Sequence, residues 1–257
     1  MTGTVAAITL WAILGMYQTL VIPGTALPIS LDCTLDAKKV KVGQPISGTI
    51  TQDIPLGDRG KIKEGSHVLG YVVDVGHRSD QSSHIRIRFD RLRAKDWDEI
   101  PIMTSLRAMA TPWEVQEAQL PKVGPMINPN PYTWTTYQVG GDAVFRGGGP
   151  VMHGRTKIGV PAPGTVGVYS RLISVEQPGC KVQNGGPLVA LWVFGSAACG
   201  AYGFDDELAI TQAGDDDPLG EILLESDGNV HVETGTGMLL ITMSMKNVQV
   251  NVAENRR

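Results

Sequence analysis

The sequence predicts a mainly β protein: a small barrel or sandwich core that carries a long, irregular insertion closed by a disulfide. Glycine and proline are plentiful, at 31 and 16 of 257 residues, which favours many turns over long helices. Short apolar segments alternate with turn signals along most of the chain. Two such segments, at 42–72 and 230–243, share one pattern, in which a Gly-Ser or Gly-Thr bend separates two apolar strands. We expect these two segments to close on each other across the intervening chain.

The first 26 residues are typical of an export signal. Val5–Met16 is an apolar run of signal-core length, and Gly24-Thr25-Ala26 places small residues where a signal peptidase cleaves. No lysine or arginine precedes Lys38, so an uncleaved membrane anchor from Val5 to Ile22 is the alternative. Either way the segment predicts an extracytoplasmic location, in the periplasm, in the envelope or secreted. Membrane contact is expected only if the segment is uncleaved.

The β core is predicted to combine residues 34–110 with residues 205–252. The pattern of apolar alternation and turns predicts strands at Pro45–Gln52, His67–Val75, His84–Leu92, Ile100–Ala110, Glu207–Thr211, Glu221–Glu225 and Val230–Met245. In the third of these, alternation places Arg86 and Arg88 on one face, opposite Ile85, Ile87 and Phe89.

Residues 111–204 are predicted to form the elaboration on this core. Four prolines between residues 121 and 131 and the glycine clusters at 140–141 and 147–149 make residues 111–165 irregular or edge structure. Trp113–Leu120 is long enough for two helical turns. Strands are expected again at Val166–Val175 and Leu188–Phe194.

The three cysteines fit an exported chain. Cys180 and Cys199 are predicted to pair in an oxidising compartment and to close the loop between them. The alternative is two unpaired buried thiols. Cys33 is left over, and it is either buried or available for pairing between chains.

Charge gives no sign of a nucleic-acid partner. The chain has 22 Lys and Arg against 26 Asp and Glu, a formal net charge of -4. Arg86, Arg88, Arg91 and Arg93 lie in one strand, but no stacking aromatic side chains alternate with them. We interpret these arginines as the polar side of a half-buried strand.

No residue pattern predicts a cofactor, and no catalytic constellation is evident. The histidines at 67, 77, 84, 153 and 231 lack zinc-site spacing, so no metal site is expected among them. Ser170, Ser174 and Ser196 lack the nucleophile-elbow motif. Carboxylates on two turns are weak calcium candidates because calcium prefers oxygen ligands, although EF-hand spacing is absent. They are Asp205, Asp206, Asp215, Asp216 and Asp217.

Two family resemblances rest on the shared segments. Residues 35–45 and 62–72, which run L-D-A-K-K-V-K-V-G-Q-P and I-K-E-G-S-H-V-L-G-Y-V, resemble exported bacterial envelope proteins without an assigned activity. The chain also resembles, more weakly, the C-terminal β-barrel of the outer-ring component of type IV secretion channels. It lacks that family's helical antenna and proline-rich arm. The residues that carry this second resemblance are Gly43, Ile46, Ile50, Gly65, Ser66, Leu69, Gly70, Gly235, Thr236, Leu239 and Ile241.

The sequence supports three hypotheses about function. The first is a non-enzymatic envelope protein with a structural or binding role through β surfaces, with other envelope proteins as partners. The second is a secreted carbohydrate-active or other hydrolytic enzyme, in which carboxylates such as Asp142 act beside an aromatic groove. The candidate groove residues are Trp113, Tyr132, Trp134 and Tyr137. The third is a periplasmic module of a secretion-type assembly, anchored by its N-terminal helix.

Overall fold

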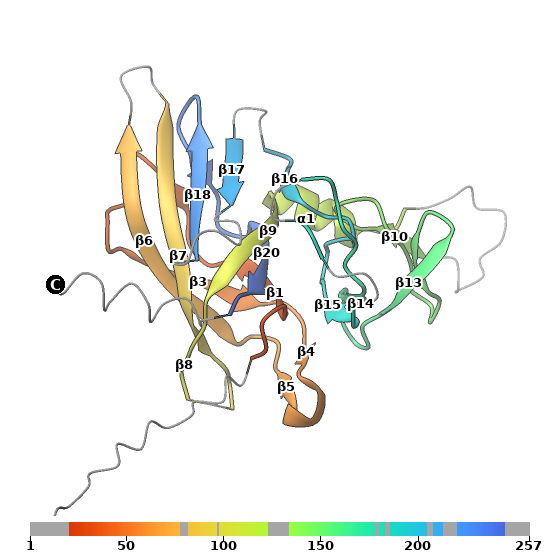
Figure 1. The fold of residues 1–257 in the computed structure, drawn as a ribbon. Helices are drawn as coiled ribbons and strands as arrows, with labels where there is room; N and C mark the ends of the chain where they lie inside the picture. Colours follow the sequence, from red (N-terminus) through yellow and green to blue (C-terminus); the bar gives the residue numbers. More distant parts are fainter. Residues whose placement is uncertain are drawn as a thin grey trace, which may run out of the picture.

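The computed structural model describes residues 21–77, 82–96, 98–122, 134–177, 180–182, 186–204, 208–212 and 220–244. It is mainly β, as predicted, and its larger sheet is nearly closed in the manner of a barrel (Figure 1). The strand order is β16-β9-β20-β1-β3-β6-β7-β18-β17, with β8 paired to β7. These strands are β1 (Ala26–Leu31), β3 (Pro45–Ile50), β6 (His67–His77), β7 (Ser83–Arg93), β8 (Ile100–Pro101), β9 (Thr104–Ala110), β16 (Gly200–Tyr202), β17 (Leu208–Gln212), β18 (Glu221–Ser226) and β20 (Gly237–Thr242).

A second sheet lies beside the barrel and takes its strands in chain order (Figure 1). Its strands are β10 (Thr135–Tyr137), β11 (Ala143–Phe145), β12 (Val151–His153), β13 (Thr156–Pro161), β14 (Val168–Ser170) and β15 (Val189–Ala190). One helix, α1 (Pro112–Gln119), leads from β9 toward this sheet. Two small ladders complete the fold, β2 (Leu35–Asp36) with β19 (His231–Val232) and β4 (Ile54–Pro55) with β5 (Lys61–Ile62), and the short 3-10 helix η1 (Gly57–Arg59) connects β4 to β5.

The two halves of the barrel differ in what covers them. Strands β6 and β7 bury alternate residues, so that Ile85, Ile87 and Phe89 face the interior while Arg86 and Arg88 lie on the outer side, as predicted. Strands β1, β9 and β20 are instead buried almost continuously. The reason is that their outer faces pack under the insertion, where a second apolar cluster joins Ala108 and Leu239 to residues of the second sheet.

The two segments with the shared pattern adopt one backbone arrangement. In the first, β5 leads through a turn at Gly65 into β6, and the amide of Gly65 donates to Ile50 O at 2.8 Å. In the second, β19 leads through a turn at Gly235 into β20, and the amide of Gly235 donates to Leu31 O at 2.8 Å. Both glycines have positive φ, +76° and +85°, which a side chain would disfavour. The barrel therefore contains the same β-turn-β unit twice, once contiguous (β3 to β6) and once assembled from the two ends of the chain (β1 with β20).

Gly70 in β6 is required by close strand packing rather than by a turn. A Cβ at this position would lie 1.9 Å from the backbone oxygen of Arg88 in β7. The register of the β6–β7 ladder shifts beside this glycine, between Leu69 and Gly70. Gly70, the last glycine of the G-S-x-x-L-G segment, is therefore needed because the backbones of β6 and β7 approach each other closely at this position.

A buried glutamine joins the barrel to the second sheet. Gln52 follows β3 and is fully buried. Its Nε2 donates to Val168 O at 3.0 Å, and its Oε1 accepts from Val168 N at 3.2 Å and from Trp192 N at 2.6 Å. One side chain thereby completes the backbone hydrogen bonds of two insertion segments, which fixes their position on the barrel.

The insertion is more regular than the sequence predicted. Residues 111–165 were expected to be irregular or edge structure, yet β10, β11, β12 and β13 lie within them. These strands are only 3–6 residues long, and the prolines and glycines fall mostly at their ends or between them, where they do not interrupt a ladder.

Strand β1 was also not predicted. It begins at Ala26, inside the segment interpreted as an export signal, of which residues 1–20 lie outside the described part of the chain.

The predicted disulfide is confirmed, since Cys180 and Cys199 are bonded. Cys33 is half-buried and unpaired. Burial raises the pKa of its thiol. A structural disulfide of this kind is typical of an oxidising, extracytoplasmic compartment. Across the described residues, no helix has the length and apolar character needed to cross a membrane.

Candidate functional site

The described aromatic residues of the predicted groove are exposed on the insertion. Trp113 on α1 is 66% exposed. Trp134, just before β10, and Tyr137, the last residue of β10, are each 49% exposed. Leu120, which caps α1, is 43% exposed. We call these four residues the α1–β10 face. Tyr132 lies outside the described residues.

Local structure explains how the α1–β10 face forms. Thr111 caps α1, with its Oγ1 accepting from the Glu114 amide at 3.4 Å, and Pro112 occupies the first turn, where no hydrogen-bond donor is needed. The inner side of α1 buries Val115 and Ala118. After the helix, the Lys122 amide donates to Thr135 O at 2.9 Å, which holds the end of α1 against β10. The C-terminal end of α1 and strand β10 are therefore neighbours.

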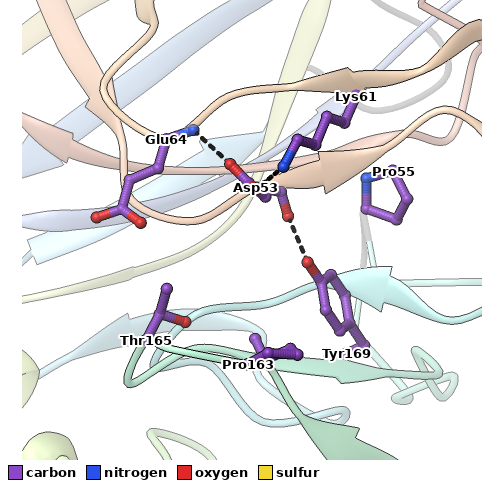
Figure 2. Close-up of a pocket in the computed structure, with 8 residues that line it drawn as sticks. Asp53, Pro55, Lys61, Glu64, Pro163, Thr165 and Tyr169 are labelled. Atoms are coloured by element: carbon purple, nitrogen blue, oxygen red, sulfur yellow. Dashed lines mark hydrogen bonds and ion pairs between the residues drawn. The ribbon is translucent and has the colours of Figure 1, made fainter.

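A small pocket of about 370 Å³ lies between the barrel and the insertion (Figure 2). Asp53, Pro55, Lys61 and Glu64 line it from the β4–β5 region of the barrel, and the β13–β14 hairpin of the insertion contributes the opposite side. The insertion residues are Ala162, Pro163, Thr165 and Tyr169. We call this hollow the seam pocket.

Hydrogen bonds within the seam pocket gather on Asp53. Its carboxylate forms an ion pair with Lys61 Nζ and accepts a hydrogen bond from the Glu64 amide at 3.0 Å. The Tyr169 hydroxyl crosses from the insertion and donates to Asp53 O at 3.0 Å (Figure 2). The Glu64 carboxylate has no hydrogen-bond or ion-pair partner among the described residues.

These contacts shift the pKa values of the pocket groups. The Lys61 ammonium, followed by the Glu64 amide, lowers the pKa of the Asp53 carboxyl. Asp53 in turn raises the pKa of Lys61. Burial, and then the nearby charge of Asp53, raises the pKa of the Tyr169 hydroxyl. The pocket therefore holds a charged Asp53–Lys61 pair and a neutral tyrosine around neutral pH.

Asp142 lies in a cluster that resembles part of a catalytic triad but has a different geometry. Its fully buried carboxylate lies 2.8 Å from His153 Nδ1 and accepts from the Ser196 amide at 2.6 Å. In a serine hydrolase the hydroxyl bonds to the ring nitrogen that faces away from the carboxylate. Here the Ser196 main chain lies on the carboxylate side, and Ser196 Oγ is buried without a hydrogen-bond partner. The cluster fixes the 195–196 bend and provides no nucleophile–base pair.

The remaining histidines contact protein groups in separate places. His84 Nε2 lies 3.0 Å from Asp74, His77 Nε2 lies 3.1 Å from Ala37 O, and His67 lies 3.6 Å from Asp32. Among the described residues, no group of three or more His, Cys, Asp or Glu side chains is arranged to hold a metal ion. The calcium candidates Asp205, Asp206, Asp215, Asp216 and Asp217 lie outside the described residues.

Sequence reasoning missed the seam pocket and two buried polar residues that join the barrel to the insertion. They are Gln52 and Arg107, whose guanidinium donates to Ile173 O, Cys180 O and Ala198 O. Asp53 and Tyr169 are 116 residues apart, so no local pattern connects them. Arg107 does carry a signal, because it is the one charge in the otherwise apolar Leu106–Ala110 run.

Comparison with known proteins gives no further assignment: no protein-family model matches the chain, and no curated protein sequence is similar to it.

Proposed function

We propose that this chain is an extracytoplasmic, non-enzymatic binding protein that contacts a protein of the cell envelope through its α1–β10 face. The export-like N-terminal segment, the resemblance to exported envelope proteins and the Cys180–Cys199 disulfide support the compartment. The observation that carries the binding role is the exposure of Trp113, Trp134 and Tyr137 on two neighbouring elements.

Exposure of this kind has an energetic cost that a partner would remove. Large apolar side chains leave water favourably, at about 25 cal/mol per Å² of buried apolar surface. Half of the exposed large apolar residues in the described part of the chain lie on this one face. Contiguous apolar surface mostly marks an interaction site, and tryptophan and tyrosine dominate binding energy at protein interfaces.

The composition of the face favours a protein partner over a sugar polymer. Sugar-binding platforms use flat aromatic rings, whereas Leu120 adds an aliphatic side chain that suits a protein contact. Beside it, Glu117 and Lys122 form an ion pair at 2.6 Å, which provides a polar rim. The geometry at Asp142, which lacks a paired nucleophile, favours binding over hydrolysis.

Cross-linking in the native envelope tests this proposal. A photoactivatable amino acid at Gln116, an exposed position of α1, should yield a discrete adduct with another protein. The double variant Trp113→Ala/Trp134→Ala should weaken binding by about 4 kcal/mol or more if both are hot spots, and so remove most of the adduct. The matched control is Val42→Ala/Leu188→Ala, which truncates two exposed apolar residues that lie outside α1 and β10 and should leave the adduct intact.

Two results would count against the proposal. An adduct that forms equally well in the Trp113→Ala/Trp134→Ala variant would place the contact elsewhere. Retention of the purified protein on isolated envelope polysaccharide, lost in the same double variant, would show that the rings bind sugar instead.

A further inference from the structure

We propose that the seam pocket binds an organic cation: an ammonium group at the end of a short aliphatic chain. This site is separate from the α1–β10 face and does not depend on the function proposed for that face. Three features of the pocket lead to this ligand class, namely its charge, its apolar wall and its size.

The charge of the pocket is uncompensated at Glu64. Asp53 is paired with the Lys61 ammonium and accepts a hydrogen bond from the Glu64 amide. Lys63 pairs with Asp96 at 2.7 Å, and Lys95, whose Nζ lies beside Gly65, forms no ion pair with Glu64. The Glu64 carboxylate lines the hollow with no partner among the described residues. Among the residues that line the pocket, two carboxylates therefore stand against one ammonium group, and this balance favours a cation over an anion.

The opposite wall suits an aliphatic chain. Ala162, Pro163 and the ring of Tyr169 line the insertion side of the pocket, which faces Glu64 and Lys61. Pro55 adds an apolar surface beside Lys61 on the barrel side (Figure 2). An aliphatic chain packs on such a surface while its charged end stays with the carboxylate, as lysine side chains do on protein surfaces. The Tyr169 ring can also attract a cation through its face.

Volume and position complete the inference. A hollow of about 370 Å³ is at the small end of ligand pockets and accommodates an amine of a few carbon atoms. Because Glu64 belongs to the barrel while Thr165 and Tyr169 belong to the insertion, the bound cation would contact both. Occupancy should therefore also raise the thermal stability of the protein.

Three small-molecule probes test the inference: n-pentylamine, 1-pentanol and pentanoate. They share a five-carbon chain and end in an ammonium, a hydroxyl and a carboxylate group. In NMR titrations of the intact protein, pentylamine should shift the backbone signals of Glu64 and Thr165, with a dissociation constant on the order of millimolar. Pentanol and pentanoate should bind at least about tenfold more weakly. Nα-acetyl-lysine methylamide distinguishes the source of the cation. Tighter binding than pentylamine indicates a lysine of a peptide, and equal binding indicates a free amine.

The variant Glu64→Gln keeps the shape of the pocket and removes the charge, so it should reduce pentylamine affinity at least about tenfold. The control variant Glu233→Gln removes a carboxylate that is 64% exposed outside the pocket and should bind like the wild type. Equal binding of pentanol or pentanoate, unchanged binding in Glu64→Gln, or no pentylamine-dependent shift at the pocket would each overturn the inference.

Discussion

Replacing Arg107 by methionine should lower the free energy of unfolding by about 3–5 kcal/mol. Arg107 in β9 is only 1% exposed. Its guanidinium donates to Ile173 O at 2.7 Å, Cys180 O at 2.9 Å and Ala198 O at 3.0 Å, with a longer contact to Ser196 O. Methionine fills much of the same volume but leaves these buried carbonyl groups without donors. Each such group costs about 1–3 kcal/mol when it stays unpaired.

Urea denaturation of purified variants measures this effect. Arg107→Lys should give an intermediate loss, because one ammonium group cannot reach all the carbonyls that the planar guanidinium serves. The matched control is Arg91→Met on β7, which removes exposed ion pairs with Asp90 and Glu99 and should change stability by less than about 1 kcal/mol. Equal stabilities for Arg107→Met and Arg91→Met would contradict the role of Arg107 as the support of the insertion.

Removing the disulfide in the double variant Cys180→Ala/Cys199→Ala should destabilise the protein by about 3 kcal/mol. The two cysteines are separated by 19 positions in the sequence, so the bond restricts a loop of moderate length in the unfolded chain. Its loss should appear as a lower urea midpoint under oxidising conditions. Wild-type protein treated with a reductant should shift to the same midpoint, and a wild type insensitive to reductant would refute the prediction.

The effects of Arg107 and the disulfide should not add. Cys180 O accepts a hydrogen bond from Arg107 and the Cys180 side chain forms the disulfide, so both interactions hold one segment in place. Once the bond is absent, this segment can move away from Arg107, and the cost of Arg107→Met should fall. A double-mutant cycle of the same unfolding measurements gives the coupling energy directly.

The sequence predicts the barrel strands because they alternate. In β7, the isoleucines and Phe89 point inward while the arginines point outward, so a period of two is visible without any structure. Strand β1 was missed for a different reason. Ala26–Leu31 follows directly on the export-like segment and contains Pro28, which argues against a central strand, although all of its residues except Ser30 are buried.

The insertion and the candidate sites were harder to predict because they depend on contacts between distant residues. The α1–β10 face contains residues that the sequence singled out as a possible groove, yet their exposure depends on how α1 packs against β10. Gln52 looks like an ordinary polar residue after a strand, and only the folded chain brings it to Trp192. The seam pocket likewise exists only where the barrel and the insertion meet.

Hydroxyl-radical footprinting in intact envelope tests the central claim, that the α1–β10 face is covered by a partner. Oxidation of Trp113, Trp134 and Tyr137 should be several-fold slower in the native envelope than in purified protein, because bound protein excludes water from the rings. Tyr71 on β6, a partly exposed residue of the barrel rather than of the second sheet, serves as the internal reference and should react equally in both samples. Equal oxidation of the three aromatic residues in envelope and purified protein would show that the face is bare in its native setting and would contradict the proposed function.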